Sequence, residues 1–500
     1  MLALSEATRR ADLERMAEAE LDVLVVGGGI TGAGVALDAA SRGLSVGLVE
    51  RDDFASGTSG RSSRMIHGGV RYLQHYDFGL VHEALRERAI LLRLAPHLVR
   101  PTTMFAPTDT VLRRALFHLG LYVYDVLATG RNLGRHREVR ADEMRVAAPG
   151  LGRPTRGVRY WECRTDDARL TVEVMRVAKG LGALVANHAA VESLIGDGRV
   201  RGARVVDTTT GERLDVRARM IVNATGAWAD RIHGMATSAP TVLRPSKGVH
   251  VVFRPGSVDT KTALFVPSGA GDRRYVFIVP WGDRVYAGTT DTEYHGDLDD
   301  PPVTEQDMDY IVGAVSTAFP GVGRADVTAT WAGLRPLLGG RTGPTADLSR
   351  KHRIFEDPPG LVTITGGKLT TYRFMAQQLV DRVARALGTG AKCRTREIPL
   401  GLTRPLEESL ARAAAAAGQL GLDPAVGRRM VYRFGDDWEA AVRRLREDPS
   451  LAEPVAQGLP VRAVEVELAR TREMAITDTD VLVRRTRLAT MDSTVTLPAR

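Results

Sequence analysis

The chain has 500 residues, 44% hydrophobic, with a formal net charge of +8 and no long uncharged apolar run, so we expect two or three domains and no membrane-spanning helix. Its two cysteines, Cys163 and Cys393, are too few for a metal cluster or a disulfide framework; no metal site is expected, and a reducing cytoplasm is the simplest location. The basic excess suits anionic lipid or anionic small molecules, and no helix-turn-helix, zinc or aromatic-platform motif points to nucleic acid.

A dinucleotide-binding turn lies near the start of the chain. Residues 1–20 mix both charges and are expected to form an exposed helical extension. The apolar strand 21–26 then runs into a G-x-G-x-x-G turn, residues 27–32, with a helix expected over 35–42. Such a turn brings backbone amides close to a pyrophosphate at a helix N-terminus. Glu50 ends the next apolar run about 20 residues later, where an acid accepts a hydrogen bond from a ribose hydroxyl.

Two basic segments follow this fingerprint. Residues 59–72 combine hydroxyls, glycines and cations, and could wrap a pyrophosphate and reach the reactive ring of a cofactor. A helix is expected over 78–96. Residues 111–140 then mix leucines and tyrosines with arginines. The sequence leaves two interpretations of this segment open: it lies in a membrane interface, or it packs on its own domain with its arginines in water.

The middle of the chain contains a second set of alternating elements. We expect a helix over 166–179, a strand over 183–185 and a hairpin over 201–216. The apolar run 220–229 is another strand that a small-residue turn breaks into a helix, so that backbone again approaches a ligand. Short alternating runs between residues 249 and 286 predict a second, antiparallel sheet.

Cations recur beside glycines in the last third of the chain. Arg335 lies in Gly-Leu-Arg-Pro after a strand-like run, and residues 364–373 read as strand, Gly-Gly turn and helix start. The amides of Gly366 and Gly367 suit a flavin carbonyl that gains negative charge on reduction. After Leu402 the sequence becomes rich in alanine, arginine and glutamate, which predicts a C-terminal helical domain.

Blocks of sequence in this order resemble the FAD-dependent glycerol-3-phosphate dehydrogenases, within the glycine-oxidase and D-amino-acid-oxidase-like flavoproteins. The blocks are VVGGGITGAGVALDAASRGLSVGLVE, SSRMIHGGVRYLQHYDFGLVHEALRER, TDDARL, IVNATGAWAD, KGVHVVF, GTTDTEY, GLRPLL and ITGGKLTTYRFMA. HGGVRYLQHY and TGGKLTTYR are specific to this family, whereas the glycine fingerprint is shared with all flavoproteins of the two-dinucleotide fold. A single fingerprint also fits FAD alone better than FAD with NAD.

The resemblance implies an α/β fold in which a Rossmann-like FAD-binding domain is interleaved with an antiparallel-sheet substrate domain and followed by a C-terminal helical domain. The expected FAD-binding domain is 21–100, 160–232 and 340–390; the substrate domain is 101–159 and 233–339; the helical domain is 400–500. The motifs place FAD against Gly27, Gly29, Ile30, Thr31, Gly32, Glu50, Arg51, Thr58, Ser59, Ser62, Ser63, Arg64, Met65, Ile66, His67, Ala190, Ala224, Thr225, Gly226, Trp228, Gly366, Gly367, Lys368, Leu369 and Thr370. Some relatives have lysine where this chain has Arg64.

The implied reaction is oxidation of sn-glycerol 3-phosphate to dihydroxyacetone phosphate by hydride transfer to flavin, with electrons passed to membrane quinone. Arginine forks bind phosphate oxygens in pairs. By motif match, Arg71 and Arg335 contact the substrate phosphate and hydroxyls, with Tyr72, Lys368 and Arg350 as neighbours.

A histidine has a suitable pKa to accept the proton of the C2 hydroxyl, and His250 is the first candidate. The alternative is that His250 is a hydrogen-bonded histidine of the sheet without a catalytic role. Lys368 would stabilise the reduced flavin. Together, the expected catalytic residues are His250, Arg335, Lys368 and Arg71.

The resemblance also implies a homodimer in peripheral contact with the inner face of the cell membrane. Three other functions stay open on sequence alone: a related flavin oxidase of an amino acid or hydroxy acid, a glycerol-3-phosphate oxidase that uses oxygen, and a non-catalytic flavin-binding protein.

Overall fold

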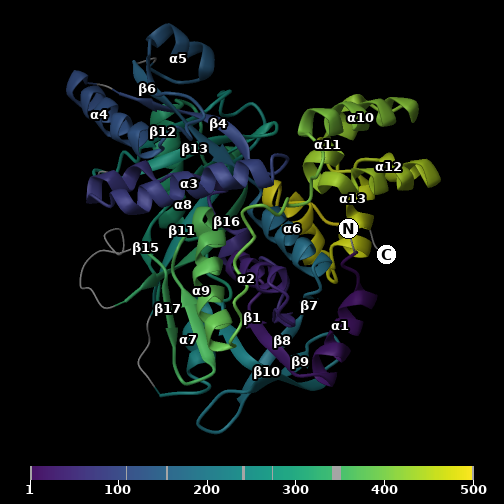
Figure 1. Cartoon of the computed structure of the whole chain (residues 1–500). Coiled ribbons are helices and arrows are strands. Elements are labelled where there is room, and N and C mark those ends of the chain that lie inside the picture. The colour runs from purple at the N-terminus through teal and green to yellow at the C-terminus, as the bar shows by residue number, and fades with distance from the viewer. Residues whose placement is uncertain are drawn as a thin grey trace.

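Two large β-sheets and a C-terminal group of helices make up the structure (Figure 1). It is a computed structural model that describes residues 3–108, 110–153, 156–238, 243–272, 274–339 and 351–497. None of the helices in these ranges is both long and apolar enough to cross a bilayer.

The first sheet has a parallel centre that is covered by helices on its faces. In sheet order its strands are β17 (Arg353–Glu356), β18 (Leu361–Thr365), β10 (Arg213–Asn223), β1 (Leu21–Val26), β2 (Val46–Val49) and β7 (Leu184–Ala186), and β9 (Gly202–Asp207) pairs with β10 and with β8 (Ala189–Ile195). The covering helices include α1 (Glu6–Glu18), α2 (Ile30–Ser41), α6 (Asp167–Gly180), α7 (Ala229–His233) and α9 (Tyr372–Ala386). Because both faces are covered, the central strands are near-continuous runs of Val, Leu and Ile.

The second sheet is largely antiparallel. Its strands run in the order β15 (Thr292–Glu293), β11 (Leu243–Phe253), β14 (Arg284–Gly288), β13 (Tyr275–Trp281), β12 (Ala263–Pro267), β4 (Arg100–Pro107), β6 (Gly157–Arg164) and β3 (Met65–Ile66), with β16 (Val327–Leu338) on β11 and β5 (Arg137–Val139) on β6. Helix α8 (Glu305–Ala318) packs on it, and α3 (Phe78–Leu94), α4 (Val111–Leu127) and α5 (Ala141–Ala147) lie around β4 and β6 (Figure 1).

The C-terminal helices form a separate body with its own core. They are α10 (Leu406–Gln419), α11 (Pro424–Phe434), α12 (Trp438–Glu447) and α13 (Ala463–Arg472). Met430, Phe434, Trp438 and Leu468 fill the core between them. In Figure 1, α10 to α13 lie at the upper right, apart from α4 and α5 at the upper left. The segment from residue 480 to 491 leaves this core. Arg485 binds Asp53 just after β2, Arg487 binds Asp166 at the start of α6, and the short helix α14 (Leu488–Met491) packs on β16 of the second sheet.

The expected fold class is confirmed, with changes at the borders of elements. Residues 160–164, expected in the FAD-binding domain, belong to the second sheet, because β6 is one continuous strand paired along its whole length with β4. The two-residue strand β3 joins the same sheet. The expected hairpin is β9 and β10, and β10 continues without a break to Asn223.

Candidate active site

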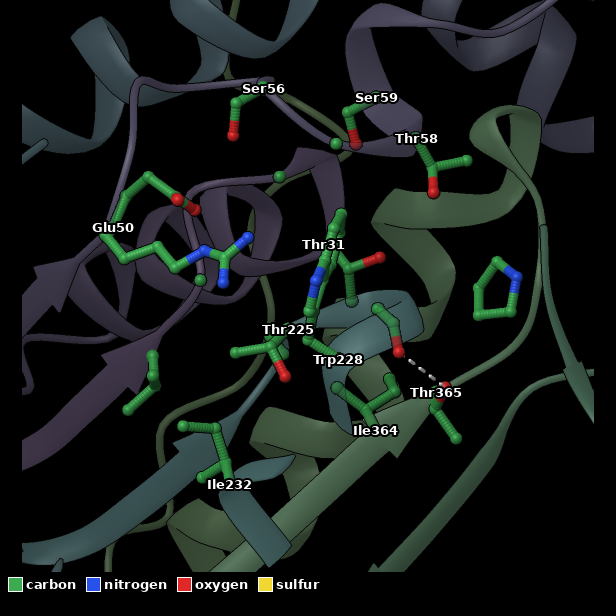
Figure 2. A pocket seen from close by; sticks show the side chains of 18 of the residues that line it. Thr31, Glu50, Ser56, Thr58, Ser59, Thr225, Trp228, Ile232, Ile364 and Thr365 are labelled. Carbon is green, nitrogen blue, oxygen red and sulfur yellow. Dashed lines mark hydrogen bonds between the residues drawn. The ribbon is translucent and has the colours of Figure 1, made fainter. Parts of the chain in front are cut away.

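The glycine turn between β1 and α2 forms one wall of a cavity of 340 Å³ (Figure 2). Gly27 has φ +111°, and a Cβ on Gly32 would lie 1.9 Å from the Gly27 carbonyl oxygen. Only glycine permits this close approach of strand and helix. Gly29, Ile30 and Thr31 line the cavity, so the positive end of the α2 dipole is directed at it.

Glu50 lines the same cavity from the end of β2. Its carboxylate accepts hydrogen bonds from the Gly28 N–H at 2.7 Å and from the Asp52 N–H at 2.9 Å. Burial raises the pKa of Glu50, and the two backbone donors oppose that rise. The carboxylate is therefore fixed at the carboxyl end of a parallel strand, where such folds place the ribose of a dinucleotide.

The far wall of this cavity comes from the turns after β10 and β18. Thr225 and Trp228 follow β10, and Gly366 and Gly367, with φ +80° and +83°, follow β18. The Thr365 hydroxyl donates to the Gly226 carbonyl at 3.4 Å, the dashed line in Figure 2. The two turns meet because the carboxyl ends of neighbouring parallel strands lie at one edge of a sheet.

Residues of the segment 58–63 also line a second cavity of 310 Å³. Thr58 and Ser59 line both cavities, as do Lys368 and Leu369. The Ser59 hydroxyl oxygen accepts from the Ile30 N–H at 2.8 Å, so the segment is attached to the first turn of α2. A ligand in the first cavity can therefore extend to the second.

The second cavity is rich in cations. Of the described side chains that line it, Arg61, Arg274, Arg335 and Lys368 are cationic, against the carboxylates of Glu162 and Asp291. The Arg335 guanidinium, on β16, donates to the Thr289 hydroxyl at 3.0 Å and to the Thr290 carbonyl at 3.2 Å, and lies 3.7 Å from the Asp291 carboxylate. Lys368 Nζ lies 3.5 Å from the centre of the Tyr72 ring, a cation–π distance.

His250 lines the second cavity from β11 and is only 2% exposed. Its Nε2 lies 2.9 Å from the Ser63 Oγ, its Nδ1 has no hydrogen-bond partner among the described residues, and its ring stacks on Trp331 at 4.7 Å. Burial, and then the charges of Arg335 and Arg64, lower the pKa of His250 well below its usual value. The imidazole is therefore neutral at pH 7.

Most of the expected site residues line these cavities. The first cavity is lined by Gly27, Gly29, Ile30, Thr31, Glu50, Arg51, Thr58, Ser59, Ala190, Ala224, Thr225, Gly226, Trp228, Gly366, Gly367, Lys368 and Leu369. The second is lined by Ser62, Ser63, Met65, His67, Tyr72, His250 and Arg335, besides the shared residues. Arg350 and the side chain of Arg71 lie outside the described part of the structure.

Four expected cofactor residues line neither cavity, for different reasons. Gly32 acts through close packing, and Thr370 exchanges hydrogen bonds with the backbone of His67 at 3.1 and 3.2 Å. Ile66 is fully buried in the core beneath the first sheet. The Arg64 side chain points away from both cavities.

Arg64 points into an aromatic cage instead of toward either cavity. Its guanidinium carbon lies 3.9 Å from the ring centre of Trp281 and 4.6 Å from that of Trp331. The residue has φ +55°, and burial lowers its pKa to about 10. Because the cage residues come from β13 and β16, nothing near Arg64 in the sequence indicates this direction.

Sequence reasoning missed Arg61 and Arg274 as residues of the second cavity. Arg61 lies inside the basic segment 59–72, and Arg274 precedes β13 directly after a glycine-rich loop. The GTTDTEY block received no role, although its Thr289, Thr290 and Asp291 contact Arg335. The signal was a run of hydroxyls and a carboxylate directly after a strand.

Three features define a dinucleotide-dependent oxidoreductase of the Rossmann type. They are the N-terminus of α2, the carboxylate of Glu50 in the position that binds a ribose, and the adjoining cationic cavity. Residues 22–382 match the family described as FAD dependent oxidoreductase, and residues 393–499 match the C-terminal domain of alpha-glycerophosphate oxidase. The chain belongs to the FAD-dependent oxidoreductase family. Its residues fit FAD for two reasons. The glycine turn, which has no room for a Cβ at Gly32, lets backbone amides approach a pyrophosphate. The first cavity also shares Thr58, Ser59 and Lys368 with the second, so a bound FAD can reach the second cavity.

Named relatives cover nearly the whole chain. The chain is 39% identical to glycerol-3-phosphate dehydrogenase 2 of Mycobacterium tuberculosis, over 97% of this chain and 84% of that protein. It is 36% identical to the aerobic glycerol-3-phosphate dehydrogenase of Staphylococcus haemolyticus, over 97% and 90%.

Solved structures agree with this placement. The glycerol-3-phosphate dehydrogenase of Bacillus halodurans, solved with FAD, superposes with a TM-score of 0.80 at 33% identity, covering 97% of this chain and 90% of that one. Glycine oxidase of Geobacillus kaustophilus shares the fold at 20% identity, with a TM-score of 0.59, covering 77% of this chain and 99% of that one.

Proposed function

We propose that this protein oxidises sn-glycerol 3-phosphate to dihydroxyacetone phosphate with FAD and passes the electrons to membrane quinone. The observation that carries the proposal is the cationic second cavity directly beside the first cavity, which fits FAD. The chain is also similar, over 97% of its length, to proteins named glycerol-3-phosphate dehydrogenase. Bound FAD would supply the acceptor for two electrons.

The cations of the second cavity suit the phosphate of this substrate. A phosphate monoester carries nearly two negative charges at neutral pH, and guanidinium forks bind its oxygens in pairs. Arg335 already has its fork fixed by Thr289 and Thr290, so little side-chain entropy is lost when it binds an anion. Arg274 and Arg61 line the same cavity, and we assign all three arginines to anion binding.

His250 is the proposed general base. When the substrate C2–H bond breaks, the C2 hydroxyl must also lose a proton for the ketone to form, and a neutral imidazole accepts it. The Ser63 contact and the stacking on Trp331 fix the ring orientation. Lys368, at the junction of the cavities, would stabilise negative charge that develops beside it.

Helix α4 supports the proposed contact with a membrane that contains the quinone. Six large apolar side chains on it are 58 to 73% exposed: Val111, Leu112, Leu116, Leu119, Tyr122 and Val126. Leu121 and Tyr124 are buried and hold the helix on its domain. An exposed apolar face with nearby arginines is typical of a helix that lies in a membrane interface, on the cytoplasmic face in this proposal.

Cosedimentation with anionic liposomes tests this contact. We expect the double variant Leu116→Glu, Leu119→Glu to lose most of its binding, and Leu181→Glu, an exposed leucine at the end of α6, to keep it. Equal binding by both variants would remove α4 from the proposal. The homodimer rests on the family resemblance alone, and light scattering of the purified protein tests it.

The primary test is anaerobic mixing of the flavin-loaded protein with sn-glycerol 3-phosphate while flavin absorbance is followed. Rapid bleaching supports the proposal, and reoxidation by quinone or by air then identifies the acceptor. The oxygen-dependent alternative is favoured by the C-terminal match to alpha-glycerophosphate oxidase. A flavin that only dithionite reduces would contradict the proposal and favour an amino-acid or hydroxy-acid oxidase.

A further inference from the structure

The C-terminal domain reaches the active site through one buried arginine. Arg487, between the helices of that domain and α14, is 2% exposed and has φ +64°. Its guanidinium donates to the Gly60 carbonyl at 2.9 Å and to the Asp166 carboxylate at 2.8 Å, and it also donates to the Asp167 carboxylate. Gly60 lies in the middle of the segment 58–63, of which Thr58 and Ser59 line both cavities and residues 61–63 line the second.

Asp167 extends this contact along the segment. One of its carboxylate oxygens binds Arg487, and the other accepts from the Ser62 N–H at 2.8 Å. Arg487 therefore holds the segment 58–63 at two backbone positions, Gly60 directly and Ser62 through Asp167. The side chains of Arg487 and Asp167 are both buried, and the loss of a charge-assisted contact between buried groups is costly.

The side chains on either side of these two fixed positions serve the proposed site. Ser59 accepts from the first amide of α2, and Ser63 contacts the Nε2 of His250. A shift of the 60–62 backbone would move one hydroxyl away from the FAD cavity wall and the other away from the proposed base. Among the described residues of the C-terminal domain, no other forms a hydrogen bond to this segment.

We propose that Arg487 is a positioning residue, through which the C-terminal domain fixes the segment 58–63 for both FAD and substrate. Only the part of this inference that concerns kcat and KM for sn-glycerol 3-phosphate rests on the proposed function. It assigns the C-terminal domain a part in the active site, besides its packing on α6.

Arg485 supplies a matched control. It is equally buried and lies two residues away. It also joins the C-terminal domain to the loop after β2, through Asp53 at 2.6 and 2.8 Å. Its hydrogen bonds go to Asp53 and to the Glu473 carbonyl, and none goes to the described residues 58–63. Arg485→Gln therefore removes an interdomain ion pair without touching the segment.

The test compares Arg487→Gln, Arg487→Lys, Asp167→Ala and Arg485→Gln. The measurements are hydrogen exchange of the peptide over residues 58–63, the dissociation constant for FAD, and kcat and KM for sn-glycerol 3-phosphate per bound FAD. For Arg487→Gln we expect at least tenfold faster exchange of the segment, at least tenfold weaker FAD binding and about a fivefold higher KM. Arg487→Lys should recover part of each, and Arg485→Gln should match the parent in segment exchange.

Asp167→Ala keeps the test decisive if Arg487→Gln does not fold, because it removes the Ser62 contact and the Arg487–Asp167 ion pair but leaves Arg487 bound to Gly60 and Asp166. Unchanged exchange in either variant, or an equal change in Arg485→Gln, would overturn the inference. If the parent protein is not reduced by sn-glycerol 3-phosphate, the proposed function fails, while exchange and FAD affinity still decide the role of Arg487.

Discussion

The two cavities meet at Thr58, Ser59 and Lys368, yet they are built in different ways. The first is shaped by backbone and small residues at the ends of parallel strands, and its main demand is space. The second is shaped by charged and aromatic side chains from both sheets, and its main demand is charge. Substitutions in the first should therefore affect cofactor retention, whereas substitutions in the second should affect the reaction with cofactor still bound.

The largest effect is expected from Gly32→Val. A Cβ at this position would lie 1.9 Å from the Gly27 carbonyl, so β1 and α2 must move apart and the turn loses its shape. We expect the purified variant to carry no FAD, measured as the ratio of flavin to protein absorbance. Gly313→Ala is the control, because it lies within α8 and, apart from the adjacent backbone of that helix, no atom lies within 4 Å of its Cβ position. A yellow Gly32→Val protein would break the comparison.

Arg335→Met should produce the next largest change. It should affect the reaction with substrate and not the retention of FAD. Charge-assisted hydrogen bonds contribute roughly 1.5 to 3 kcal/mol each, so loss of the fork should lower kcat/KM for sn-glycerol 3-phosphate by about a hundredfold. FAD content should stay at the parental level. Arg254→Met, an exposed arginine paired with Asp326, is the control. If Arg335→Met loses FAD instead, the two cavities are not separable.

His250→Asn should slow flavin reduction at least tenfold while FAD stays bound, because the variant has no group to accept the hydroxyl proton. Stopped-flow absorbance at saturating substrate measures this rate. An unchanged rate would show that His250 is a hydrogen-bonded histidine of the sheet and not the base.

The pH profile of the parental protein sharpens the same point. The folded-state pKa of His250 is depressed, so the neutral form persists as the pH falls through the ordinary histidine range. The reduction rate should therefore show no loss from protonation of His250 between pH 8 and about pH 6.5. The lowered pKa also affects the free energy of unfolding. As the pH falls below about 6.5, this histidine becomes protonated in the unfolded chain but stays neutral in the folded protein, so the folded protein becomes less stable. A rate that halves near pH 6.5 would contradict the buried, neutral imidazole.

The same contrast explains how far sequence reasoning reached. One wall of the first cavity could be read from the sequence because its parts are local: Gly27 to Gly32 and Glu50 fall within one strand, helix and strand, and the strand pattern fixes their geometry. The second cavity depends on which strands of the second sheet pair, and β11, β13 and β16 are far apart in sequence. Arg274 was missed and Arg64 misplaced for this reason, since the partners of each are set by tertiary packing.

The contact from Arg487 to Gly60 joins residues 427 positions apart, and no local pattern announces it. A buried arginine near the C-terminus is visible only as one more cation in a basic chain. Its role depends on the fold, because Asp166 and Asp167 are presented together at the N-terminus of α6.

The smallest expected effect tests the junction of the two cavities. Lys368→Met removes a positive charge next to both, so reduction of bound flavin, which adds negative charge, should become less favourable. A lowering of the midpoint potential by about 30 mV would correspond to ~1.4 kcal/mol for a two-electron couple. Lys392→Met, an exposed lysine after α9, should leave the potential unchanged. Tyr72→Phe keeps the ring face under Lys368 and should also leave it unchanged, whereas Tyr72→Leu should not. An unaltered potential in Lys368→Met would assign the lysine to substrate binding alone, and the junction would then belong functionally to the second cavity.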